Sequence, residues 1–208
     1  MTLPKYIFMA GAPGSKWSSV CKNIYYSPNI DRSDYNNERT YYHSAWGHPE
    51  LMHLGTYFDP GMEFGKQFMQ LPQLGKQAAE AEFDRPFSGE GVRIIKSHVF
   101  CHHLDYIKNT WPDCPIVLVH RNNDACLGWW VRCGQFNITY PNYQYYSNLE
   151  MMAMHIDQQN ADIKHFAMSN RRIDVDNNHE LANELRIACP PQEYLQNYKA
   201  CDIEVMIV

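Results

Sequence analysis

The sequence predicts an α/β fold in which a mostly parallel central sheet is flanked by helices. Three short apolar runs, at residues 5–11, 92–98 and 115–121, have the length and composition of buried strands. Segments with the polar and apolar pattern of helices separate these runs, and strands that alternate with helices build parallel sheets. A fourth, less apolar strand is expected at residues 202–208.

The helices are expected between these strands and after the third one. Their ranges are 16–26, 61–82, 102–110, 122–134 and 147–169, followed by shorter helices at 177–187 and 191–199. The first of the shorter helices can be capped by Asp176 or Asn177, and the second follows Pro190 and Pro191. Residues 27–57 are rich in Tyr, Asn, His and Asp without a clear period, which favours irregular structure.

Length and composition indicate one domain over residues 1–208. The chain is 45% hydrophobic, 20% charged and 13% aromatic, as in globular proteins. A chain of this length can bury roughly 70% of the surface that it exposes when unfolded. The formal net charge of -5 argues against a broad surface for nucleic acid or anionic membrane. No run is long and apolar enough to span a membrane, so we expect neither as a partner.

The cysteines and the first residues bear on location and metal binding. Seven cysteines without a Cys-x-x-Cys pair predict neither a disulfide framework nor a zinc site. The first residues lack the pattern of a secretory signal. We therefore expect a cytoplasmic protein with reduced thiols and no metal.

The segment GAPGSKWSS, residues 11–19, has the glycine, proline and hydroxyl residues of a phosphate-binding loop between a strand and a helix. It does not fit the Walker pattern G-x-x-x-x-G-K-[ST]. Ser15 precedes Lys16, and Trp17 separates that lysine from Ser18. The phosphate-binding loop is therefore of another kind.

In an open parallel sheet, ligands bind where loops leave the carboxyl ends of the strands. The three apolar strands place residues 11–19, 96–98 and 120–124 at such ends. We expect the functional site there.

These three strand ends, in this order, resemble the sulfotransferases that use 3'-phosphoadenosine-5'-phosphosulfate (PAPS). PGSKWSS, from residue 13, is similar to the family motif P-[KR]-S-G-T-T-[WL], with Gly14 in place of the basic residue and Lys16 two positions later. IIKSHVF, from residue 94, resembles the strand end K-[TS]-H. WPDCPIVLVHRNNDACLGWW, from residue 111, resembles P-D-A-K-V-I-Y-V-x-R-N-P-x-D-x-A-x-S.

The resemblance implies a P-loop-like sulfotransferase fold. It also implies transfer of a sulfuryl group from PAPS to a hydroxyl or amine of a small molecule, or to a hydroxyl of a glycan or peptide, with PAP as the product. His98 is the implied base, Lys16 stabilises the leaving phosphate, and Lys96 is the third catalytic group. Arg121 binds the 3'-phosphate. The implied cofactor-binding residues are Gly14, Ser15, Lys16, Trp17, Ser18, Ser19, Arg121 and Asn123.

Two features of the family are not found. The serine eight positions beyond the arginine falls on Trp129, or on Gly128 after a one-residue deletion, and Asn123 can substitute for it. The late R-K-G-x-x-G phosphate loop has no counterpart. The adenine can stack on Trp17 or Trp129, and residues 41–58 offer aromatic and imidazole groups for the acceptor.

Three alternatives stay open. Glu50 can serve as the base, as glutamates do in other sulfotransferase branches. A P-loop kinase for a nucleotide or small metabolite would depend on magnesium, but the third strand leads into His120 and Arg121 without an aspartate for the metal. Gly14 and the missing serine favour a sulfotransferase-like protein that binds PAP without catalysis.

Overall fold

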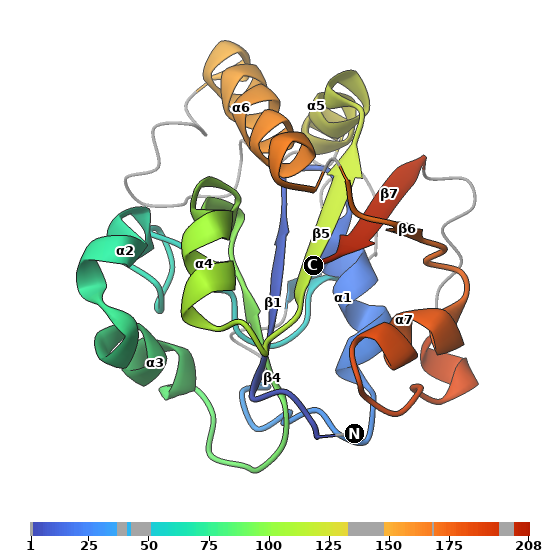
Figure 1. Ribbon diagram of the computed structural model, residues 1–208. Coiled ribbons are helices and arrows are strands. Elements are labelled where there is room, and N and C mark those ends of the chain that lie inside the picture. Colours follow the sequence, from blue (N-terminus) through green and yellow to red (C-terminus); the bar gives the residue numbers. More distant parts are fainter. Residues whose placement is uncertain (1, 37–40, 43–50, 133–147, 168, 196–201) are drawn as a thin grey trace.

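The computed structural model describes residues 2–36, 41–42, 51–132, 148–167, 169–195 and 202–208, and shows an α/β fold (Figure 1). Its five-stranded sheet has the order β4-β1-β5-β7-β6. The strands are β1 (Tyr6–Gly11), β4 (Arg93–Lys96), β5 (Ile116–Arg121), β6 (Arg172–Ile173) and β7 (Ile203–Ile207). All four predicted strands are confirmed, and β6 is an addition.

The sheet is parallel in its centre and mixed overall. β1 lies between β4 and β5 and is parallel to both, while β7 is antiparallel to β5 and to β6. The prediction of a mostly parallel sheet therefore holds for the centre, and β7 reverses the direction at one side. The connection from β4 to β5 crosses β1, so the carboxyl ends of these three strands meet at one edge.

The central strands are buried on both faces, which is why they read as continuous apolar runs. In β1, Tyr6, Phe8 and Ala10 pack into the core on one face of the sheet, and Ile7 and Met9 pack into the core on the other. This alternation follows from the two-residue period of a strand.

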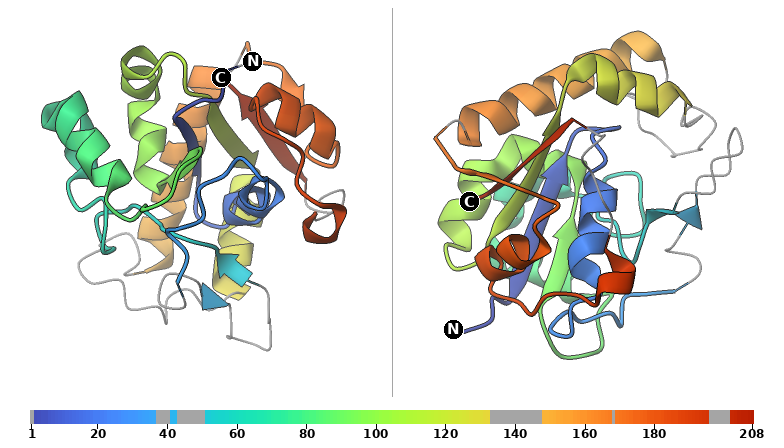
Figure 2. Two further views of the ribbon diagram at one scale, coloured as in Figure 1. Left: turned by 90° about the horizontal axis from the view of Figure 1, so that it is seen from below. Right: turned by 90° about the vertical axis from the view of Figure 1, so that its right-hand side faces the viewer.

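Helices cover both faces of the sheet (Figure 2). On one face lie α1 (Trp17–Tyr25) and α7 (Asn178–Glu184). On the other lie α3 (Lys76–Asp84), α4 (Leu104–Thr110) and α6 (Leu149–Ala167), and α5 (Asn123–Arg132) packs against α6 beyond the ends of β1 and β5. The shorter elements are α2 (Leu71–Leu74), the 3-10 helices η2 (Phe68–Gln70), η3 (His98–His103) and η6 (Gln192–Tyr194), and a two-stranded sheet of β2 (Tyr41–Tyr42) and β3 (Leu51–His53).

Two predicted helices were too long, and the irregular region holds two short strands. The segment predicted at 61–82 becomes helical only from Phe68, because Gly65 takes a φ of 79°, which a right-handed helix does not contain. Within the described part of 191–199, only Gln192–Tyr194 is helical. β2 and β3 lie in the region expected to be irregular, and two-residue or three-residue strands leave no readable alternation.

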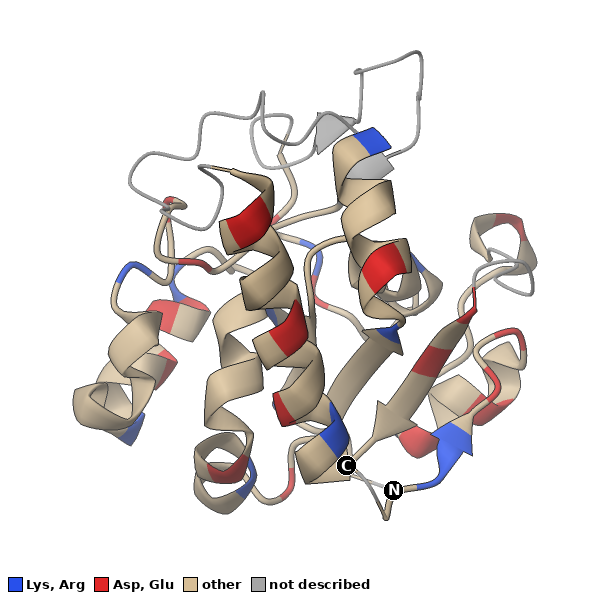
Figure 3. Cartoon of the chain, turned by 90° about the horizontal axis from the view of Figure 1, so that it is seen from above, with Lys and Arg blue, Asp and Glu red and all other residues tan. Residues whose placement is uncertain are grey.

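Charged side chains are distributed unevenly around the sheet edge where the three parallel strands end. Figure 3 shows acidic residues along α6 and a basic residue near its carboxyl end. Lys16 follows β1 and Arg121 ends β5, so these two residues bring positive charge to the edge where the parallel strands end. Among the described residues, no helix combines the length and apolar character that a membrane crossing requires.

Candidate functional site

The loop between β1 and α1 is a tight turn at the carboxyl end of the central strand. The Ser15 amide donates to the Ala12 carbonyl at 3.0 Å, and Lys16 adopts a left-handed conformation with φ 68° and ψ 17°. α1 then begins at Trp17, with the Val20 amide bonded to the Lys16 carbonyl. The loop thus brings Lys16 to the amino end of a nine-residue helix, where the helix dipole favours anions.

Gly14 allows this loop to pack directly against α5. Its φ is 79°, and a Cβ at this position would lie 2.0 Å from the Cys126 carbonyl oxygen. No side chain fits there. The sulfotransferase motif that the loop resembles has a basic residue at this position, which the close contact with α5 does not allow here.

Replacing Gly14 with alanine should therefore destabilise the protein. We expect a loss of about 2–4 kcal/mol in the free energy of unfolding, from the left-handed backbone and the overlap with the Cys126 carbonyl. The matched control is Gly128→Ala on exposed α5, where a Cβ meets nothing within 4 Å and helix propensity favours alanine by up to about 1 kcal/mol. Urea unfolding measures both, and a Gly14→Ala protein as stable as wild type would contradict the packing argument.

Arg121, at the end of β5, fastens the same loop. Its Nη1 donates to the Gly14 carbonyl at 3.2 Å and to the Ala125 carbonyl at 3.3 Å. Its Nε is buried and has no hydrogen-bond partner among the described residues. The guanidinium is thus held beside the loop, and its buried Nε–H can still donate a hydrogen bond to a ligand.

His98, just beyond β4, lies on the other side of the loop. Its Nδ1 is 2.7 Å from the Gly11 carbonyl oxygen, and its ring meets the rings of Trp17 and Tyr57 edge-on at 5.1 and 5.5 Å. Because Nδ1 donates to this carbonyl, Nε2 carries the lone pair. Burial lowers the pKa of His98 to about 4, against a smaller opposing effect of the hydrogen bond to Gly11, so the imidazole is neutral at pH 7.

Lys16 and Lys96 have different surroundings. The Lys16 ammonium lies 4.0 Å from the centroid of the Trp129 ring on α5. The Lys96 ammonium is buried and donates to the Leu54 carbonyl, which holds the segment before Phe58 against β4. Lys16 thus lies at the loop. Lys96 makes a structural contact, and its role as a catalytic residue stays a prediction.

The hydroxyl residues of the loop lie where the resemblance places them. Ser15 is fully buried, and its Oγ has no partner among the described residues. Ser18 and Ser19 occupy the first turn of α1 and are partly exposed. Trp17 is 2% exposed and packs into the core, so its indole offers little surface for an adenine.

Asn123 is committed to other contacts. Its Nδ2 donates to Asp157 at 2.6 Å, and its Oδ1 accepts from Asn160 at 2.6 Å, so it ties α5 to α6. The neighbouring Asn122 caps α5, with Oδ1 accepting from the amides of Asp124 and Ala125. Asparagine is a preferred N-cap, a signal that the sequence offered for Asn122 and that we missed.

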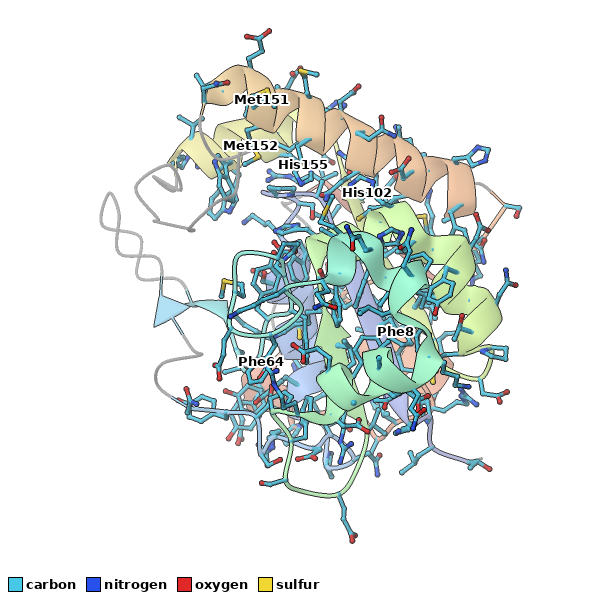
Figure 4. The ribbon with its side chains drawn as sticks, turned by 90° about the vertical axis from the view of Figure 1, so that its left-hand side faces the viewer. Phe8, Phe64, His102, Met151, Met152 and His155 are labelled. Carbon is cyan, nitrogen blue, oxygen red and sulfur yellow. The ribbon has the colours of Figure 1, made fainter. Side chains whose placement is uncertain are left out.

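Two residues of α6, His155 and Gln159, lie next to His98 in the structure, and the sequence analysis did not single them out. Gln159 Nε2 donates to the His98 carbonyl at 3.1 Å and lies 3.0 Å from His155 Nε2. Burial, then the nearby His98 and His102, lowers the pKa of His155 to about 3. Figure 4 shows His155 beside His102 of η3, with the two ring centroids 6.0 Å apart, and His102 Nδ1 bonds Asp162 at 2.6 Å. His155 and Gln159 are four residues apart, which places them on the same side of α6, and this spacing is the signal that the sequence offers for the pair.

Other proposed groups lie outside the described residues or away from the loop. Glu50, and with it residues 43–50 of the segment 41–58 proposed for the acceptor, are outside the described residues. Two cavities, of about 570 and 350 Å³, lie beside the start of β1 and beside His102, respectively. Neither is lined by the loop residues.

The described part of the chain holds no group of three or more His, Cys, Asp or Glu side chains arranged for a metal ion, and its five cysteines are free thiols. Lys16, Ser15 and Arg121 form a candidate anion site at the loop, and the neutral imidazole of His98 lies beside it. The chain matches no protein-family model, and comparisons with curated proteins and with solved structures gave no significant match.

Proposed function

We propose that the protein is a PAPS-dependent sulfotransferase, whose acceptor is a hydroxyl or amine. The observation that carries the proposal is the attachment of three strand ends to one loop. His98, two residues beyond β4, bonds the Gly11 carbonyl, Arg121 from β5 bonds the Gly14 carbonyl, and Lys16 ends the same loop. An imidazole, a guanidinium and an ammonium thereby border a single turn at the amino end of α1.

The loop fits a bound phosphosulfate because it has hydrogen-bond donors without partners. The Ser15 hydroxyl and Arg121 Nε are buried and unsatisfied among the described residues. The phosphosulfate would be a partner for the Ser15 hydroxyl, and the 3'-phosphate would be a partner for Arg121 Nε. PAPS supplies an activated sulfuryl group attached to a phosphate. Lys16 and the amino end of α1 stabilise negative charge on that phosphate, and Arg121 is the donor for the 3'-phosphate.

His98 is the base in this proposal. With Nδ1 bonded to Gly11, the lone pair on Nε2 is available to take a proton from an acceptor hydroxyl. The low pKa keeps the ring neutral, and hence able to accept a proton, at physiological pH. Gln159 fixes the backbone of His98 through its carbonyl, so the ring keeps its place while it acts.

Ligand-dependent melting tests the proposal. PAP at about 100 times its dissociation constant should stabilise the fold by about 2.7 kcal/mol and raise the melting temperature by about 5 °C or more. AMP, which lacks the 3'-phosphate, should stabilise less. Arg121→Ala should weaken PAP binding about tenfold or more relative to AMP binding, since a hydrogen bond to a charged group contributes about 1.5–3 kcal/mol.

The comparison of PAP with AMP removes the effect of Arg121→Ala on the loop itself, because both ligands meet the same altered loop. Stabilisation by ATP with magnesium but not by PAP would favour the kinase and reject the sulfotransferase. Binding of PAP without transfer of radiolabelled sulfate from PAPS to any of a panel of phenols, sugars, amines and peptides would favour the catalytically inactive alternative.

A further inference from the structure

We propose that Trp129 is a positioning residue for Lys16, an inference that rests on the proposed function for its ligand. The Lys16 ammonium lies 4.0 Å from the centroid of the indole ring, within the range of a cation–π interaction. Trp129 belongs to α5, the helix that follows β5, and Lys16 belongs to the loop that follows β1. The contact therefore joins the segments that follow these two neighbouring strands.

The position of Trp129 follows from the packing of the loop on α5. The Cys126 carbonyl touches Gly14, and the Ala125 carbonyl accepts from Arg121, so the first turns of α5 are fixed against the loop. Trp129 lies three residues beyond Cys126 and therefore on the same side of the helix. The indole is thereby presented to the side chain of Lys16.

Lys16 needs such a partner to hold one position. A lysine side chain has four rotatable carbon links and loses about 2 kcal/mol of rotamer entropy when it is fixed. The Lys16 backbone is left-handed and its side chain does not cap α1, so the helix does not fix the ammonium. An indole face attracts an ammonium more strongly than other aromatic rings do, which limits where the charge can lie.

This assignment changes the interpretation of Trp129. The sequence offered it as a platform for adenine, but its ring already receives the Lys16 ammonium, and the Arg132 guanidinium lies 5.7 Å from the same ring. The serine of the sulfotransferase motif, which binds the 3'-phosphate, aligns with Trp129, or with Gly128 after a one-residue deletion. In this chain Trp129 acts instead on the leaving phosphate, through Lys16.

The contact itself can be tested without any ligand. Reductive methylation with ¹³C-formaldehyde labels lysines and keeps their positive charge, and a methyl group over an indole is shifted upfield by the ring current. The Lys5 ammonium lies 4.7 Å from the centroid of the Tyr6 ring, so its resonance can be shifted as well. We expect a second upfield-shifted resonance that is absent in Lys16→Arg and returns to the position of exposed lysines in Trp129→Leu. A Lys16 resonance at the ordinary position in the wild-type protein would overturn the inference.

A double-mutant cycle on PAP affinity tests whether the contact positions the charge. Trp129→Leu should weaken PAP binding about three- to tenfold, while Trp129→Phe, which keeps an aromatic face, should weaken it less. In a Lys16→Met background, Trp129→Leu should have no further effect. An equal loss in both backgrounds would mean that Trp129 acts only on the fold, and would overturn its role as a positioning residue.

The two proposals fail in different ways. A shifted Lys16 resonance that disappears in Trp129→Leu, in a protein that binds no PAP, would support the positioning of Lys16 and reject the proposed ligand. Tight PAP binding that is insensitive to Trp129→Leu would leave the proposed function standing and reject the role of Trp129.

Discussion

His98→Asn should lower the rate of sulfuryl transfer about 10²- to 10⁴-fold while the protein stays folded and binds PAP. Removal of a general base has an effect of this size. Asparagine can place its Nδ2 where His98 has Nδ1, so the hydrogen bond to the Gly11 carbonyl is retained and only the lone pair of Nε2 is lost. Transfer of radiolabelled sulfate from PAPS measures the rate, and calorimetry with PAP measures binding.

The pH dependence adds a second criterion for His98. Because its pKa is lowered to about 4, transfer should not lose this base between pH 8 and pH 5, and should lose it only as the pH approaches 4. His98→Gln is the control for the hydrogen bond to the Gly11 carbonyl. The amide of glutamine lies one carbon further from the backbone than that of asparagine, so its nitrogen does not take the place of Nδ1. Wild-type turnover in His98→Asn would reject His98 as the base and direct attention to Glu50.

Acidification should destabilise the fold well before its carboxylates are protonated. Burial lowers the pKa of His98 to about 4 and of His155 to about 3, whereas both titrate near 6.5 in the unfolded chain. Between these values the unfolded state binds more protons, so the free energy of unfolding falls as the pH falls. For two such groups we expect a loss of roughly 4 kcal/mol between pH 7 and pH 5.

Urea unfolding across this pH range measures the loss. His155→Gln should reduce the loss by about 2 kcal/mol, because glutamine does not titrate and its side-chain oxygen can still accept from Gln159. His165→Gln, at an exposed position of the same helix, is the matched control for replacing a histidine of α6 with glutamine. A stability that is flat from pH 7 to pH 5 would contradict the burial of two neutral imidazoles.

Much of the fold could be predicted because the central strands are buried on both faces. The apolar runs that became β1, β4 and β5 needed no tertiary information to be recognised. The direction of β7 could not be read from its residues, since a half-buried strand has the same pattern in either orientation. β6 has two residues, too few for a period.

The sequence predicted which residues of the candidate site lie at the loop, but it did not predict the contacts that those residues make. The order of the strand ends placed Lys16, His98 and Arg121 at one loop, and the structure puts all three there. The partners of Lys96 and Arg121 are backbone carbonyls, which every residue has and no pattern marks. The contacts of Gly14 and Trp129 depend on how α5 packs, and local sequence does not encode that packing.

The pairing of β5 with β7 has a consequence for synthesis of the protein. Paired residues of the two strands lie far apart in the chain; His120 and Glu204, for example, are separated by 84 positions. At about 5–20 residues per second, a ribosome needs roughly 4–17 s to make the stretch between them. During that time the edge of β5 that later pairs with β7 has no partner strand. A polypeptide released before residue 203 would keep this apolar edge unpaired, and it could then associate with other copies or with chaperones.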